Sequence, residues 1–290
     1  MDPSYVGPPQ ARIVREGDGV LILGIEPDVI QSGMLRLEVA EAIGSVVIDR
    51  PAKRNALSEE MWAELPALMA RLSEDERVGA IVFRSDDPRV FSAGADLSDL
   101  QRGVEDPSRA ERGLDVIRAG FEAVRSVDKP TLAAIRGACH GGGAGLAVSC
   151  DLRLADTTAV FSIPPARLGL VYPFPALRRL MWLVGEGQAK RLLFTAAVFD
   201  AVEAARIGFV DEVVEPAGLE ARIEEMARSL SAVSRTSVRS TKRVMGLIEE
   251  ADPDAAATAR LLEMQALAGG DHAEGLAALL DKREPRFPDV

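Results

Sequence analysis

Two glycine-bearing stretches are the most informative part of the sequence. They are Phe91-Ser92-Ala93-Gly94-Ala95-Asp96-Leu97 and Gly137-Ala138-Cys139-His140-Gly141-Gly142-Gly143-Ala144-Gly145-Leu146. Each stretch follows an apolar run typical of a strand, at 80–83 and 131–135, and precedes a helical pattern. Glycine and alanine leave backbone N–H groups uncovered at the positive end of a helix dipole. Two such turns that face each other can hold one carbonyl oxygen between two N–H donors. The sequence therefore predicts an oxyanion hole.

Carboxylates are missing from the neighbourhood of these turns. Residues 136–149 and 160–185 contain no aspartate or glutamate, so the predicted site can polarise a carbonyl but lacks the usual acid and base. Asp96 is the only carboxylate in the first turn, and its position is typical of a helix N-cap, with a catalytic role as the alternative. His140 precedes the glycines of the second turn, where a structural role is favoured over that of a general base.

Composition excludes several classes of partner. A net charge of −11 argues against nucleic acid, which needs clustered lysine and arginine, although a small anionic ligand needs only a local basic patch. Cys139 and Cys150 lie among apolar or small residues, which predicts a reducing, cytoplasmic location. His140 and His272 are too far apart for a histidine metal site, so no metal is expected. No apolar run is long enough to span a membrane, and no membrane partner is expected.

The order of elements predicts an α/β protein. Residues 1–33 are predicted to be an N-terminal extension, in which the apolar run 19–25 could add an edge strand. Residues 34–215 alternate strand and helix patterns and form the predicted core, with a polar, mobile loop at 101–109. Helical patterns dominate residues 216–290, a region suited to covering a site or building an oligomer.

Further motifs lie in register with the two turns. They are Asp49-Arg50-Pro51-Ala52-Lys53-Arg54-Asn55-Ala56-Leu57, Cys150-Asp151-Leu152-Arg153, Phe161-Ser162-Ile163-Pro164 and Lys282-Arg283-Glu284-Pro285-Arg286-Phe287. Together these motifs closely resemble the enoyl-CoA hydratase/isomerase (crotonase) family over Met34 to Phe287. The resemblance implies a spiral of β-β-α units, with C-terminal helices that build a homotrimer or a dimer of trimers. It also implies an acyl-CoA thioester ligand and fatty acid metabolism as the setting.

The resemblance also assigns roles to individual residues. It implies that the N–H groups of Ala95 and Gly142 hold the thioester oxygen, where an enolate charge develops during the reaction. Coenzyme A enters as part of the substrate. No separate cofactor is expected, because the dinucleotide and phosphate-loop motifs are absent. The residues expected to contact the coenzyme A moiety are Lys53, Arg54, Ala93, Asp96, Lys282 and Phe287.

The chain departs from the family where a hydratase transfers protons. Hydratases of this family carry two glutamates, and this sequence has Gly145 and Pro165 at those positions, so two-glutamate hydration is not expected. Changing both residues to glutamate is predicted to restore some hydration. One alternative is an acyl-CoA lyase that decarboxylates malonyl-type thioesters, a reaction that needs no base, with Tyr172 near the reacting group. Tyr172 could equally be a pocket wall whose hydroxyl bonds to the backbone. A further alternative is a non-catalytic acyl-CoA-binding protein.

Overall fold

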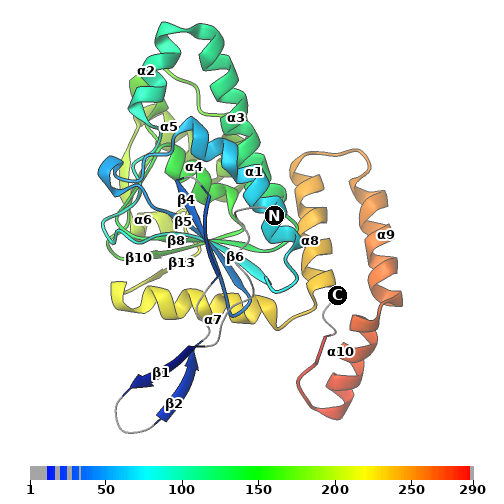
Figure 1. Ribbon diagram of the computed structural model, residues 1–290. Coiled ribbons are helices and arrows are strands. Elements are labelled where there is room, and N and C mark those ends of the chain that lie inside the picture. Colours follow the sequence, from blue (N-terminus) through cyan, green and yellow to red (C-terminus); the bar gives the residue numbers. More distant parts are fainter. Residues whose placement is uncertain (1–11, 17–19, 25–27, 33, 288–290) are drawn as a thin grey trace, which may run out of the picture.

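A seven-stranded sheet forms the centre of the computed structural model, which describes residues 12–16, 20–24, 28–32 and 34–287 (Figure 1). Its strand order is β13-β10-β8-β6-β5-β4-β3. Strand β4 pairs antiparallel with β3 and β5, whereas the pairs from β5 to β13 are parallel. The strands are β3 (Asp28–Ser32), β4 (Leu35–Ala40), β5 (Ile43–Ile48), β6 (Ala80–Ser85), β8 (Thr131–Ile135), β10 (Leu152–Asp156) and β13 (Glu212–Val214).

A second, four-stranded sheet has the order β12-β11-β9-β7 and carries the two glycine turns. Strand β9 lies parallel to both β7 and β11, so the turns that follow β7 and β9 emerge from the same edge. A separate hairpin joins β1 (Arg12–Glu16) and β2 (Val20–Gly24). The strands of the second sheet are β7 (Val90–Ser92), β9 (Ala138–His140), β11 (Val160–Ser162) and β12 (Val198–Asp200).

Helices cover both faces of the larger sheet. Helix α7 packs on one face through Leu219, Ile223 and Ala227, and α1 and α3 cover the other, where Trp62 and Phe121 meet edge to face at 4.5 Å. The helices are η1 (Pro51–Lys53), α1 (Glu59–Glu74), α2 (Leu97–Glu105), α3 (Pro107–Ser126), α4 (Gly142–Ser149), η2 (Pro165–Leu168), α5 (Phe174–Thr195), α6 (Ala201–Arg206), η3 (Pro216–Gly218), α7 (Leu219–Ser231), α8 (Arg235–Glu249), α9 (Ala255–Ala268) and α10 (Gly270–Asp281).

The structure confirms the mixed α/β fold with a helical C-terminal region and corrects two local predictions. The segment 101–109 is not a polar loop, because α2 and α3 run through it with a break only at Asp106, which caps α3. The run 19–25 does not add the edge strand. It contains β2 of the separate hairpin, and β3 pairs with β4 at the edge instead. The segment 1–33 therefore contributes a strand to the central sheet.

Helices α8, α9 and α10 form an arm at the side of the α/β body (Figure 1). Several large apolar side chains of this arm remain exposed in the single chain. None of the described helices is long and apolar enough to cross a membrane. The exposed apolar side chains of α9 and α10 are Leu261, Met264, Leu267, Leu276, Leu279 and Leu280.

Candidate functional site

The two glycine turns lie against each other. Gly94 has φ +105°, and a Cβ there would lie 3.0 Å from the carbonyl oxygen of His140 and 3.4 Å from the nitrogen of Gly142. A Cβ on Gly142 would in turn lie 3.5 Å from the amide nitrogen of Ala95. Only glycine combines this backbone conformation with so close an approach. The turns of β7 and β9 thus bring the amides of Ala95 and Gly142 together.

The first turn leaves one backbone N–H without an internal partner. Leu57 bridges this turn, since its N–H donates to Gly94 O at 2.7 Å and its carbonyl accepts from Asp96 N at 3.1 Å. Between these two bonds, the N–H of Ala95 has no hydrogen-bond acceptor among the described residues. A buried or half-buried N–H normally has a partner, so an unpaired one is available to a ligand.

The second turn repeats this pattern. Gly141 has φ +50° and ψ −111°, a conformation closed to residues with a side chain, and its N–H donates to Ser162 O at 2.9 Å. Its carbonyl accepts from Gly145 N at 3.0 Å and from the Tyr172 hydroxyl at 3.0 Å. Gly142 is the first residue of α4, and no acceptor for its N–H is found within the described part of the chain. This N–H lies at the positive end of a helix.

Asp96 caps α2, which confirms the N-cap prediction. Its carboxylate accepts from Ser98 N at 2.8 Å and from the Arg50 guanidinium at 2.5 Å. Burial raises the pKa of Asp96, but the hydrogen bonds from Ser98 and Arg50 outweigh this effect and lower the pKa to about 2. Sequence reasoning missed Arg50 as the partner. The only sequence signal for this partner was that Arg50 belongs to the 49–57 motif.

His140 lies half-buried beside the second turn. Its Nδ1 and the Ser162 hydroxyl form a hydrogen bond of 2.9 Å. Burial, and then the charge of Arg54, lower the pKa of His140 below its ordinary value. The imidazole is therefore neutral at pH 7 and tied to strand β11.

Gly145 lies next to the Tyr172 hydroxyl, and the space between them is too small for a side chain at position 145. A Cβ on Gly145 would lie 2.6 Å from the ring of Phe121 and 2.8 Å from the Tyr172 hydroxyl. Tyr172 is only 7% exposed, and burial raises the pKa of its phenol far above the ordinary range. Pro165 begins η2. A glutamate at position 145 would therefore require Phe121 or Tyr172 to move.

The remaining predicted contacts divide into two groups. Ala93 N donates to Arg54 O at 3.0 Å, so the exposed side chains of Lys53 and Arg54 extend from a segment bonded to the first turn. Lys282 is the C-cap residue after α10, and Phe287 lies near Gly275 of that helix. Figure 1 shows α10 at the end of the arm, away from α2 and α4. One chain thus brings Lys53 and Arg54 to the turns but not Lys282 or Phe287.

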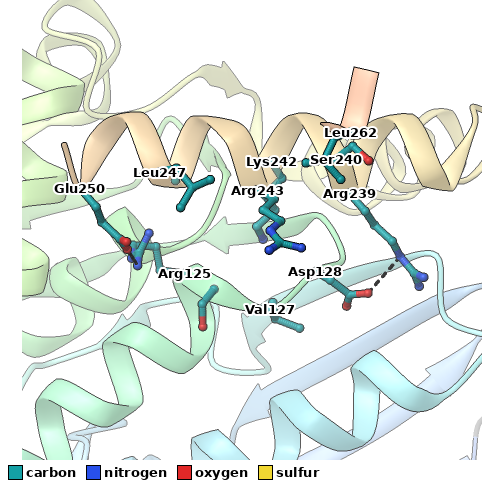
Figure 2. A pocket seen from close by; sticks show the side chains of 12 residues that line it. Arg125, Val127, Asp128, Arg239, Ser240, Lys242, Arg243, Leu247, Glu250 and Leu262 are labelled. Carbon is teal, nitrogen blue, oxygen red and sulfur yellow. Dashed lines mark hydrogen bonds and ion pairs between the residues drawn. The ribbon is translucent and has the colours of Figure 1, made fainter. Parts of the chain in front are cut away.

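A cavity of about 360 Å³ lies elsewhere, between the arm and the body. Figure 2 shows α8 above it, with Arg239 paired to Asp128 and Arg125 beside Glu250. Behind them, Lys242 pairs with Asp151 at 2.6 Å. Glu249 also pairs with Arg178 and Arg179. We call all of these ion pairs the arm junction. No cluster of histidine, cysteine or carboxylate suited to a metal occurs among the described residues.

Comparisons with known proteins agree on one family. A family model described as enoyl-CoA hydratase/isomerase matches residues 38–290. The chain is 32% identical over 257 residues to the crotonyl-CoA hydratase of Syntrophomonas wolfei, covering 87% of this chain and 96% of the relative. It is 32% identical over 254 residues to the short-chain-enoyl-CoA hydratase of Clostridium acetobutylicum, covering 86% and 95%. A crystal structure of an enoyl-CoA hydratase/isomerase family protein from Hyphomonas neptunium matches with a TM-score of 0.85 and 36% identity, over 89% of this chain and 98% of that one.

Proposed function

Because the chain belongs to the enoyl-CoA hydratase/isomerase family, we propose that it binds an acyl-CoA thioester and stabilises the enolate of that thioester. One observation carries the proposal. The N–H groups of Ala95 and Gly142 lie side by side and have no acceptor among the described residues. Two such donors suit a thioester oxygen, and they suit the more negative enolate oxygen better. Binding that strengthens as charge develops lowers the barrier to enolate formation.

The size of this effect is large enough to matter. Removing one donor from an oxyanion hole of another enzyme costs about 3 kcal/mol of transition-state stabilisation. The donors here are backbone amides in turns built on two parallel strand ends, so little reorganisation is needed when charge appears. Lys53 and Arg54 extend from the segment bonded to the first turn, and we assign them to the phosphates of coenzyme A.

Hydration fits this site poorly. Adding water to an enoyl thioester needs a base for the water and an acid for the α-carbon. Gly145 and Pro165 can do neither, and Asp96 is committed to Arg50 and to the N-terminus of α2. Each general acid or base contributes about 10²–10⁴-fold. We therefore expect hydration of crotonyl-CoA to be several orders of magnitude slower than in a two-glutamate hydratase.

Decarboxylation of a malonyl-type thioester is the second candidate, and the neutral surroundings of the amide pair favour it. When the bond between the α-carbon and the carboxylate carbon breaks, its electron pair becomes the enolate and CO₂ leaves. A proton from water then completes the product. No base is required, so an enolate-stabilising amide pair is sufficient. The buried ring of Tyr172 supplies an apolar wall behind the turn.

Assembly is part of the same proposal. We infer a homotrimer or dimer of trimers, because the apolar side chains of α9 and α10 exposed in one chain need a cover. In such an assembly, Lys282 and Phe287 of a neighbouring copy could reach the coenzyme A moiety. Light scattering that gives the mass of a monomer at micromolar concentration would exclude this assembly.

A panel of thioesters tests the function. Acetyl-CoA, crotonyl-CoA, malonyl-CoA and methylmalonyl-CoA are titrated by calorimetry, with the free acids and coenzyme A as controls, and products are followed by mass spectrometry. We expect tighter binding of the thioesters, little hydrated crotonyl-CoA, and loss of CO₂ from a malonyl thioester. Binding without any product would favour a non-catalytic acyl-CoA-binding protein. Equal affinity for thioesters and free acids would overturn the proposal, and rapid hydration would restore the hydratase assignment.

A further inference from the structure

The two peptide groups that carry the free N–H donors are held in different ways. A trans peptide is planar, so its carbonyl and its N–H point in opposite directions and turn together. The Gly94–Ala95 peptide is held at its carbonyl by the backbone N–H of Leu57, at 2.7 Å. The Gly141–Gly142 peptide is held at its carbonyl by Gly145 N and by a side chain, the hydroxyl of Tyr172, each at 3.0 Å.

We propose that Tyr172 is a positioning residue, whose hydroxyl fixes and polarises the Gly141–Gly142 peptide so that its N–H points at the thioester oxygen. This inference rests on the proposed function and names a residue for it. A donor on the carbonyl of a peptide makes the N–H of that peptide a stronger donor, because hydrogen bonds in a chain polarise one another. The hydroxyl proton is already used by Gly141, so Tyr172 acts through the peptide rather than on the substrate.

The surroundings of Tyr172 support a fixed role. Its side chain is only 7% exposed, and its phenol stays neutral because burial raises the pKa. Neutral phenol keeps the proton that Gly141 O accepts. The hydroxyl also occupies the space next to Gly145, where a Cβ would approach within 2.8 Å. Gly145 therefore makes room for the hydrogen bond, which gives a physical reason for a glycine at this position.

Infrared spectroscopy of bound thioester tests the proposal directly. Acetyl-CoA labelled with ¹³C at the thioester carbonyl is bound to the full-length protein, and the carbonyl stretching frequency is compared with that of the free ligand. Donors on the oxygen lower this frequency. In the Tyr172→Phe variant, which keeps the ring, we expect the frequency to return part of the way towards the free value. The affinity is expected to fall by no more than about tenfold, the scale of one hydrogen bond.

A matched control separates positioning from packing. Phe121→Leu loosens the same cluster, in which Phe121 lies 4.5 Å from Trp62, but removes no hydrogen bond to the turn. We expect this variant to melt at a lower temperature and to leave the carbonyl frequency of bound acetyl-CoA unchanged. An unchanged frequency in Tyr172→Phe, with the wild-type protein lowering it, would overturn this inference alone. A wild-type protein that binds acetyl-CoA without lowering the frequency would overturn the proposed function as well.

Discussion

The glycine turns and the arm junction differ in the groups they use: the turns present neutral backbone amides, whereas the arm junction is built from ion pairs. At the turns, the available groups are neutral backbone amides, and the one carboxylate, Asp96, is neutralised by Arg50. At the arm junction, the helix α8 is attached through ion pairs, among them Lys242 with Asp151 and Arg179 with Glu249. Neutral donors add no net charge of their own, so they suit the enolate that we propose forms there. Paired charges hold two surfaces together without presenting a net charge to a ligand.

Ion pairs and unpaired amides are effective under different conditions. A salt bridge needs two partners that the protein itself supplies, and its value falls with exposure to water and salt. An unpaired amide at the start of a helix needs no counter-charge and costs little when empty if water can reach it. We therefore expect changes at the turns to alter stability and ligand chemistry together, and changes at the arm junction to alter stability alone. Three predictions test this division, from the largest effect to the smallest.

Gly145→Glu places a charge into the neutral region and should have the largest effect on stability. Its Cβ would lie 2.6 Å from Phe121, and its carboxylate would enter a buried space. Overpacking and an unpaired buried charge together should lower the free energy of unfolding by about 4 kcal/mol or more. Chemical denaturation measures this change, and a crotonyl-CoA assay should detect no gain in hydration. A stable, hydrating variant would show that the site admits a proton-transferring acid.

Glu249→Ala removes a charge from the arm junction and should affect stability alone. The Glu249 side chain is 6% exposed and lies 3.4 Å from Arg178 and 3.3 Å from Arg179. Its loss leaves two half-buried guanidinium groups without this partner, which should cost about 3 kcal/mol. Glu263→Ala, an exposed change on α9, is the control and should be nearly neutral. If Glu249→Ala also weakens acetyl-CoA binding severalfold in folded protein, the two regions are not independent.

Asp96→Asn tests the one place where the turns use a charge. The folded-state pKa of Asp96 is about 2, below the ordinary value of 3.8. The carboxylate therefore adds stability above about pH 4, and this contribution disappears as the pH falls through about 2. At pH 7 the variant should be less stable by on the order of 2 kcal/mol. Thermal melting of both proteins between pH 7 and pH 2 should show the gap closing with acid. A stability difference that stays constant with pH would mean that the contacts of Arg50 and Ser98 with position 96 do not need a charged carboxylate.

Much of the fold was predictable because its signals are local. Serine is a residue type that favours helix N-caps, and the Ser58 hydroxyl accepts from Met61 N at the start of α1. Apolar and polar residues alternate from Leu35 to Val39, a pattern typical of a strand, and this segment forms β4, which pairs antiparallel with β5. The pairing of the turns was predictable for the same reason, since strand, glycine and helix follow one another twice. Positions with a positive φ, such as position 94, often carry glycine, so the sequence itself indicates where such turns can form.

The rest depends on tertiary contacts that no local pattern records. The start of α2 was predicted, but its C-terminal half was predicted as a loop, because no residue of α2 is buried and the helix therefore shows no buried apolar stripe. Leu97 and Val104 are both largely exposed. Asp106 followed by Pro107 was the overlooked signal, because aspartate caps helices and proline favours their first position. The Tyr172–Gly141 hydrogen bond joins residues 31 positions apart, and Arg50 and Asp96 are 46 apart.

The use of backbone amides at Ala95 and Gly142 has a consequence for how this chain can evolve. Every residue except proline carries an N–H, so most point mutations at position 95 cannot delete the donor itself. We expect the stronger constraint at Gly94 and Gly141, because their positive φ values are needed to form the turns. The surrounding side chains can then change one at a time while the amide pair persists. If the amide pair stabilises an enolate as we propose, a lineage can exchange one reaction for another while it keeps that site.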